Sequence, residues 1–221
     1  MMMQPMPKSP LRPGIALAVL VAGHIFASIF MRNLGAGIGE IADPWAAKIA
    51  KIFYSAFAFT AGHLAPFMAV FILFVIYRIW RGKNIQWGID ILGALLTVRC
   101  FVIFVLLNLL LLSQLRAGGL LLMQLILFLP VITLNFGWLY WRLDTGARMK
   151  GQRHIRFAED DESPSPFDYF YIATRTLLQF EPTGASGTSR LMKALFVIHG
   201  VMMLDLVALT LSRAISLASG G

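Results

Sequence analysis

Apolar runs close to 20 residues long recur along this chain, and they limit its fold more than any other feature. A helix of about 20 apolar residues matches the hydrocarbon core of a bilayer, which is about 30 Å thick. Charged residues bound the runs, as they do in membrane-spanning helices. We place five such runs at residues 14–31, 53–77, 89–112, 118–141 and 191–217. The sequence therefore predicts an all-α membrane protein with five transmembrane helices.

The composition agrees with a membrane setting and excludes most soluble classes of protein. Of the 221 residues, 58% are hydrophobic and only 14% are charged. The 19 Lys and Arg against 11 Asp and Glu give a net charge of +8, but these bases lie in loops beside the apolar runs. Topogenic charge and contact with anionic lipid headgroups account for such placement, so we expect the lipid bilayer and not nucleic acid as a partner. The expected location is the cell inner (plasma) membrane, with several passes.

One apolar segment is too short to cross a bilayer. Residues 167–180 read FDYFYIATRTLLQF and would make a helix of about 21 Å. A polar turn at 181–189 (EPTGASGTS) and the last apolar run follow it. This order is typical of pore modules, in which non-helical backbone at membrane depth lines a cavity. We therefore expect a re-entrant pore-type helix in addition to the five transmembrane helices.

These features predict four successive regions. Residues 1–13 are an N-terminal tail, and residues 14–141 form a four-helix transmembrane region. Residues 142–165 form a charged loop with a basic half followed by an acidic half, which we expect to be solvated. Residues 166–217 form the pore-like module, composed of a short helix, a turn and the final transmembrane helix.

Loop charges favour a cytoplasmic N-terminus, because more Lys and Arg then fall on the inner side. The short segment would then enter from the cytoplasm, opposite to the direction in potassium channels. Three explanations stay open: the charge count misleads, the module is inverted, or residues 167–182 cross a locally thinned membrane.

A resemblance to a known family rests on the last third of the chain. The stretch DYFYIATRTLLQFEPTG, followed by SRLMKALFVIHG and a final apolar helix, is similar to the pore-helix, filter and inner-helix order of bacterial potassium channels. The preceding LNFGWLYWRLDTG also resembles an uncharacterised bacterial integral membrane protein family. The resemblance covers roughly residues 130–217, and it implies a homotetramer around an ion path.

The filter departs from that family. In place of a T-x-G-Y-G filter, the chain has Leu178, Gln179, Phe180, Glu181, Pro182, Thr183 and Gly184. Potassium selectivity depends on backbone carbonyls that point into the pore, whereas proline fixes φ and large side chains replace glycine here. We therefore expect no potassium selectivity.

Charged residues inside apolar segments are the candidate site residues. A ring of Glu181 carboxylates in a tetramer would attract monovalent cations, although a hydrated carboxylate at a segment end explains it equally simply. Asp205 lies in the last apolar run, where it would line a cavity or form a buried pair with Arg99. Arg175, in the middle of the short helix, could pair with Asp205 or Glu181.

Three functions follow from these residues. The first is a channel-like protein, a weakly selective ion channel with a non-standard filter; it is no enzyme and needs no metal or cofactor. The alternative is a non-conducting membrane scaffold protein that keeps the module for oligomerisation. The third is a haem-binding membrane redox subunit, with ligands among His24, His63 and His199. Each of these histidines is also explained as a hydrogen-bonding residue inside the membrane. Cys100, the single cysteine, excludes an intramolecular disulfide.

Overall fold

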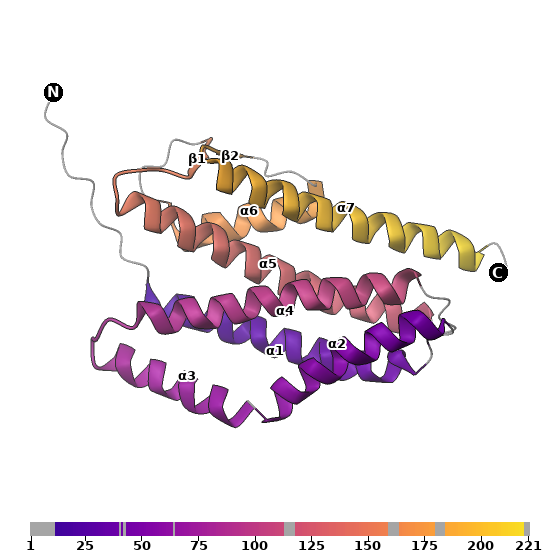
Figure 1. Ribbon diagram of the computed structural model, residues 1–221. Helices are drawn as coiled ribbons and strands as arrows, with labels where there is room; N and C mark the ends of the chain where they lie inside the picture. The colour runs from indigo at the N-terminus through magenta and orange to yellow at the C-terminus, as the bar shows by residue number, and fades with distance from the viewer. Residues whose placement is uncertain are drawn as a thin grey trace, which may run out of the picture. The chain divides into compact units, whose positions relative to one another are not determined.

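The computed structural model describes residues 12–39, 41, 43–63, 65–112, 118–158, 164–179 and 184–218. Helices account for most of these residues (Figure 1). The chain divides into two compact units. Residues 13–135 with 205–218 form the α1–α4 unit, and residues 136–204 form the α6 unit.

The α1–α4 unit is built around two long apolar helices, α1 (Pro13–Ile38) and α4 (Gln86–Leu112). They pack along much of their length, together with α2 (Pro44–His63) and α3 (Ala65–Trp80). The side chains buried in α1 recur every three or four residues, which is the spacing of one helix face. They include Ala16, Leu20, Ala27, Phe30 and Leu34.

The structure divides the expected span 53–77 between two helices. Helix α2 ends at His63 and α3 begins at Ala65, and the two helices diverge from their junction in Figure 1. Pro66 lies in the first turn of α3, where its missing N–H leaves no intrahelical hydrogen bond unmade. A proline at the same place inside a continuous helix would remove such a bond, so the residue favours a new helix start.

Four helices are long and apolar enough to cross a membrane, and they indicate a membrane protein. The candidate spans are Pro13–Gly35, Gln86–Leu110, Leu125–Arg148 and Arg190–Ser212. Residues Pro66–Trp80 of α3 form a shorter apolar helix. Large apolar side chains on these helices are exposed, as expected where acyl chains replace water. Val98 of α4, for example, is 62% exposed.

The α6 unit contains parts of two long helices, α5 (Gly118–Arg148) and α7 (Arg190–Ala218). They run antiparallel in this unit, since Phe136 stacks on His199 and Tyr140 contacts Phe196. Between them come β1 (Ile155–Phe157), α6 (Pro166–Gln179) and β2 (Ala185–Gly187). Helix α5 continues to Arg148, so the first seven residues of the expected charged loop 142–165 are helical.

The two strands form a small antiparallel ladder. Arg156 pairs with Ser186 at its centre, and hydrogen bonds extend it on both sides, from Thr188 N to the His154 carbonyl and from Ala158 N to the Gly184 carbonyl, each 2.9 Å. Gly151, with φ of 74°, adopts the left-handed conformation in the turn that leads from α5 to β1. Because β1 and β2 are hydrogen-bonded, the segment that contains α6 begins and ends at the same place.

Candidate functional site

A buried carboxylate organises the α6 unit. Asp144, near the end of α5, has no exposed surface. Its Oδ1 accepts hydrogen bonds from the backbone N–H groups of His154 and Ile155, at 2.7 and 2.8 Å. Its Oδ2 accepts from the Tyr169 hydroxyl at 2.8 Å and from Arg148 Nε at 2.6 Å. One side chain therefore joins α5, β1 and α6.

The Asp144 cluster holds α6 by its first turn. Burial raises the pKa of the Tyr169 hydroxyl, and the neighbouring Asp144 carboxylate raises it further, so Tyr169 stays a neutral donor. Close to it, α6 lies against a glycine of α5: a methyl group added at Gly137 would overlap the Phe170 ring. The sequence offered one signal for Asp144, an acid and a base four residues apart at the end of an apolar run, and the sequence analysis did not use it.

Helix α6 has two different faces. Its buried residues, Tyr169, Ile172, Ala173 and Thr176, follow helical spacing. The outward face carries Phe167, Tyr171 and Leu178, which are 72%, 47% and 67% exposed. A short helix whose outward face is also apolar suits contact with lipid or with another copy of the chain.

Arg175 lies on that outward face and bonds within its own helix. Its Nη1 donates to the Tyr171 hydroxyl at 2.6 Å, and its Nε and Nη2 donate to Gln179 Oε1 at 3.1 and 3.0 Å. The guanidinium carbon also lies 5.5 Å from the centre of the Tyr171 ring. The expected pairing of Arg175 with Glu181 falls outside the described residues.

The filter-like segment is described in part. Leu178 and Gln179 end α6, and both are exposed. Gly184, with φ of 85°, stands directly before β2. Phe180, Glu181, Pro182 and Thr183 lie outside the described residues.

A second buried polar contact connects α5 and α7 in this unit. His199 is fully buried, its ring is stacked on Phe136 with centroids 4.1 Å apart, and its Nδ1 shares a 3.0 Å hydrogen bond with the Tyr140 hydroxyl. Its Nε2 is buried and has no hydrogen-bond partner among the described residues. The contact with Tyr140 fits a hydrogen-bonding histidine inside the membrane, the alternative that the sequence offers to a haem ligand.

In the α1–α4 unit the structure brings Arg99 of α4 together with His24 of α1. His24 Nε2 lies 3.1 Å from the Leu92 carbonyl, which can only accept, so Nε2 carries the proton. The other ring nitrogen, Nδ1, is then an acceptor, and Arg99 Nη1 donates to it at 3.2 Å. The guanidinium carbon also lies 4.7 Å from the centre of the Phe57 ring.

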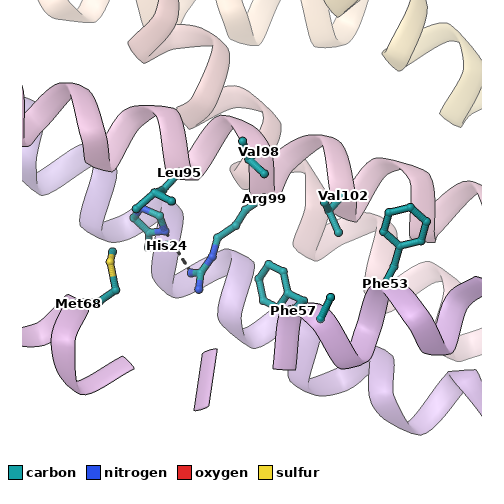
Figure 2. Close-up of a pocket in the computed structure, with 9 residues that line it drawn as sticks. His24, Phe53, Phe57, Met68, Leu95, Val98, Arg99 and Val102 are labelled. Atoms are coloured by element: carbon teal, nitrogen blue, oxygen red, sulfur yellow. Dashed lines mark hydrogen bonds between the residues drawn. The ribbon is translucent and has the colours of Figure 1, made fainter. Parts of the chain in front are cut away.

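Arg99 and His24 line a pocket of about 280 Å³, and the other described residues that line it are apolar. Figure 2 shows the Arg99 side chain reaching toward His24, with Phe57 of α2 beside it and Met68 of α3 nearby. A guanidinium inside a membrane span costs about 2.5 to 3.5 kcal/mol on insertion scales, so such a residue normally has a partner. Within the part of the chain that the structure describes, no carboxylate lies within ion-pair distance of Arg99.

Asp205 does not pair with Arg99, although both belong to the α1–α4 unit. It is half-buried in α7, within the candidate span Arg190–Ser212. No hydrogen bond or ion pair joins it to another residue that the structure describes. The expectation of a buried Asp205–Arg99 pair is therefore replaced by the Arg99–His24 contact.

The described part of the chain holds no cluster of metal-binding side chains. No group of three or more His, Cys, Asp or Glu side chains able to hold a metal occurs among the described residues. Both ring nitrogens of His24 are already hydrogen-bonded, and nothing is described of the His63 side chain.

No protein-family model, curated protein or solved structure matches this chain. The resemblance to the pore order of potassium channels therefore stays a prediction.

Proposed function

We propose that the protein is a channel-like integral membrane protein in which the α6 units of several copies surround an ion path. The ladder between β1 and β2 carries this proposal. It joins residue 155 to residue 187, so whatever lies between them leaves and returns on one side of the membrane. Helix α6 has 14 residues and reaches only about 21 Å. A re-entrant helix meets both conditions.

The full topology that we propose has five transmembrane helices and one re-entrant helix. Four of the transmembrane helices contain the candidate spans, and α2 with α3 together make the fifth crossing. The site of action is the inner membrane of a bacterial cell. A homotetramer, the assembly implied by the resemblance, would place four copies of α6 around one axis.

Weak selection among monovalent cations is the activity that we propose. Asp205 supports it, since an acid in a membrane span without a partner among the described residues suits an aqueous path or a second copy. The ring of Glu181 expected from the sequence would act in the same way at the mouth of the path.

A non-conducting scaffold is the second candidate, and Arg175 favours it. A cation on the outward face of α6, without a carboxylate partner among the described residues, opposes the passage of other cations. The aromatic residues on the same face suit contact between copies. In this case the module would serve only oligomerisation.

Cysteine labelling tests the re-entrant helix. In a Cys100→Ala background, Ser165→Cys and Ser186→Cys place exposed thiols on either side of α6. Both thiols should react with a membrane-impermeant maleimide from the same face of sealed vesicles. Labelling from opposite faces would show that the segment crosses, and the proposal would fail.

Ion flux then separates the two candidates. Purified protein that is tetrameric in mild detergent should carry both K⁺ and Na⁺ into liposomes. A tetramer without flux supports the scaffold, and a monomer excludes a shared ion path altogether.

A further inference from the structure

We propose that the pocket between α1, α2, α3 and α4 binds the carboxylate of a single-chain amphiphile, that is, a fatty acid anion. The pocket lies wholly within the α1–α4 unit. Its use does not depend on the ion path proposed above.

The charge of the pocket selects an anion. Among the described residues that line it, Arg99 and His24 are the polar side chains and the others are apolar. One guanidinium N–H is bonded to His24, whereas the remaining N–H groups have no partner among the described residues. Two parallel N–H groups of a guanidinium match the two oxygens of a carboxylate. The protein thus supplies the cation and leaves the anion to a ligand.

The Arg99 guanidinium is held ready for such a ligand. The Leu92 carbonyl fixes the His24 ring, and His24 in turn orients one edge of the guanidinium. Phe57 covers one face of the guanidinium plane. A donor that is already oriented loses less conformational entropy on binding.

The depth and size of the pocket favour a fatty acid over a phospholipid. Arg99 lies near the middle of the span Gln86–Leu110, roughly 16 to 20 Å of helix from either end. A phospholipid phosphate stays at headgroup level, far from this depth. The volume of about 280 Å³ is just below the lower end of small-ligand pockets, about 300 Å³. It has room for one small head and the first part of one chain.

The rim provides an exit for the rest of the chain. Val98, Leu95 and Phe53 line the pocket and are 62%, 40% and 39% exposed. These apolar side chains lie at the pocket opening, within the membrane-spanning part of α4 and beside it. An acyl chain can therefore continue from the pocket into the surrounding lipid.

Binding of radiolabelled tetradecanoate to the full-length protein in phosphatidylcholine nanodiscs tests the proposal. The wild-type protein should bind it saturably and should bind the uncharged methyl ester at least tenfold more weakly. Arg99→Gln removes the charge and should weaken binding at least tenfold, and Arg99→Lys should give an intermediate loss. Arg32→Gln removes an exposed arginine from the end of α1 and should change nothing.

A second variant fills the pocket without touching its charge. Ala56→Phe places a ring among the lining residues and should also reduce tetradecanoate binding. Equal binding of the acid and the ester, or wild-type binding by both Arg99→Gln and Ala56→Phe, would overturn the proposal. So would displacement of tetradecanoate by phosphatidylglycerol, which would assign the site to a phospholipid, or stronger binding of a short-chain quinone, which would assign it to a neutral acceptor.

Discussion

Asp144 and Arg99 are both charged residues within apolar helices, but they differ in whether the described residues neutralise the charge. The Asp144 carboxylate is surrounded by four donors, two of them backbone N–H groups, so its burial is compensated within one chain. Arg99 has a histidine and an aromatic ring but no anion among the described residues. The role of Asp144 is therefore structural, whereas Arg99 has guanidinium N–H groups that could bind a ligand.

The hydroxyl of Tyr169 should be essential to the position of α6. Tyr169→Phe removes one donor from the buried carboxylate and should cost about 1.5 to 3 kcal/mol, the range for a hydrogen bond to a charged group. We expect a lower midpoint of heat-induced unfolding in detergent, followed by circular dichroism. Tyr171→Phe is the matched control, because that hydroxyl accepts only from Arg175, four residues further along the outward face of α6. Equal midpoints for the two variants would contradict the role of the Asp144 cluster.

At the level of single residues the sequence identified charges but not their partners. It indicated Arg99 and His24 separately and offered Asp205 as one alternative partner of Arg99, because nothing in a linear pattern tells which faces of two apolar helices meet. The 75 residues between His24 and Arg99 are bridged only by the packing of α1 on α4. Asp144 was missed for a similar reason, since two of its donors are backbone groups without any sequence signature.

At the level of elements, long apolar helices were predictable and short irregular pieces were not. The expected short helix at 167–180 agrees closely with α6, which proline begins and which polar residues limit on both sides. The strands have three residues each, IRF and ASG, which is too short for a periodic pattern. The divided span at 53–77 reflects Pro66, which average hydropathy does not register.

Cross-linking can test the ladder directly. In a Cys100→Ala background, Arg156→Cys with Ser186→Cys places two thiols on directly opposed residues, with Cα atoms at the separation of about 5.5 Å that a disulfide needs. Oxidation should link them within one chain, detected as a change in gel mobility that dithiothreitol reverses.

As a control, a second pair of cysteines is placed on the same two segments at positions that do not face each other. Ala158→Cys with Thr188→Cys also places one exposed thiol on each of the two paired segments. These two positions, however, lie roughly 13 Å apart along the strands. This pair should not cross-link. Linking of both pairs at the same rate would mean that the segments slide or that the ladder does not form.

At the level of the whole molecule, Asp205 of α7 has no ion-pair or hydrogen-bond partner among the residues that the structure describes. We therefore expect Asp205→Asn to assemble normally, since no buried cation loses its counter-ion, and to lower cation flux in liposomes. Light scattering in mild detergent measures assembly, and Asp43→Asn is the control because Asn replaces Asp equally well at the N-cap of α2. Loss of assembly in Asp205→Asn would assign this residue to contacts between copies.

The ladder also determines how α7 enters the membrane. Since β1 and β2 meet on one side, the number of crossings between the end of α5 and the start of α7 is even. The direction of α7 is then inherited from α5 and does not depend on the two bases in its own first turn, Arg190 and Lys193. Reversing those charges would have little effect on topology, whereas the bases that follow α5 would orient both helices as one inserting hairpin.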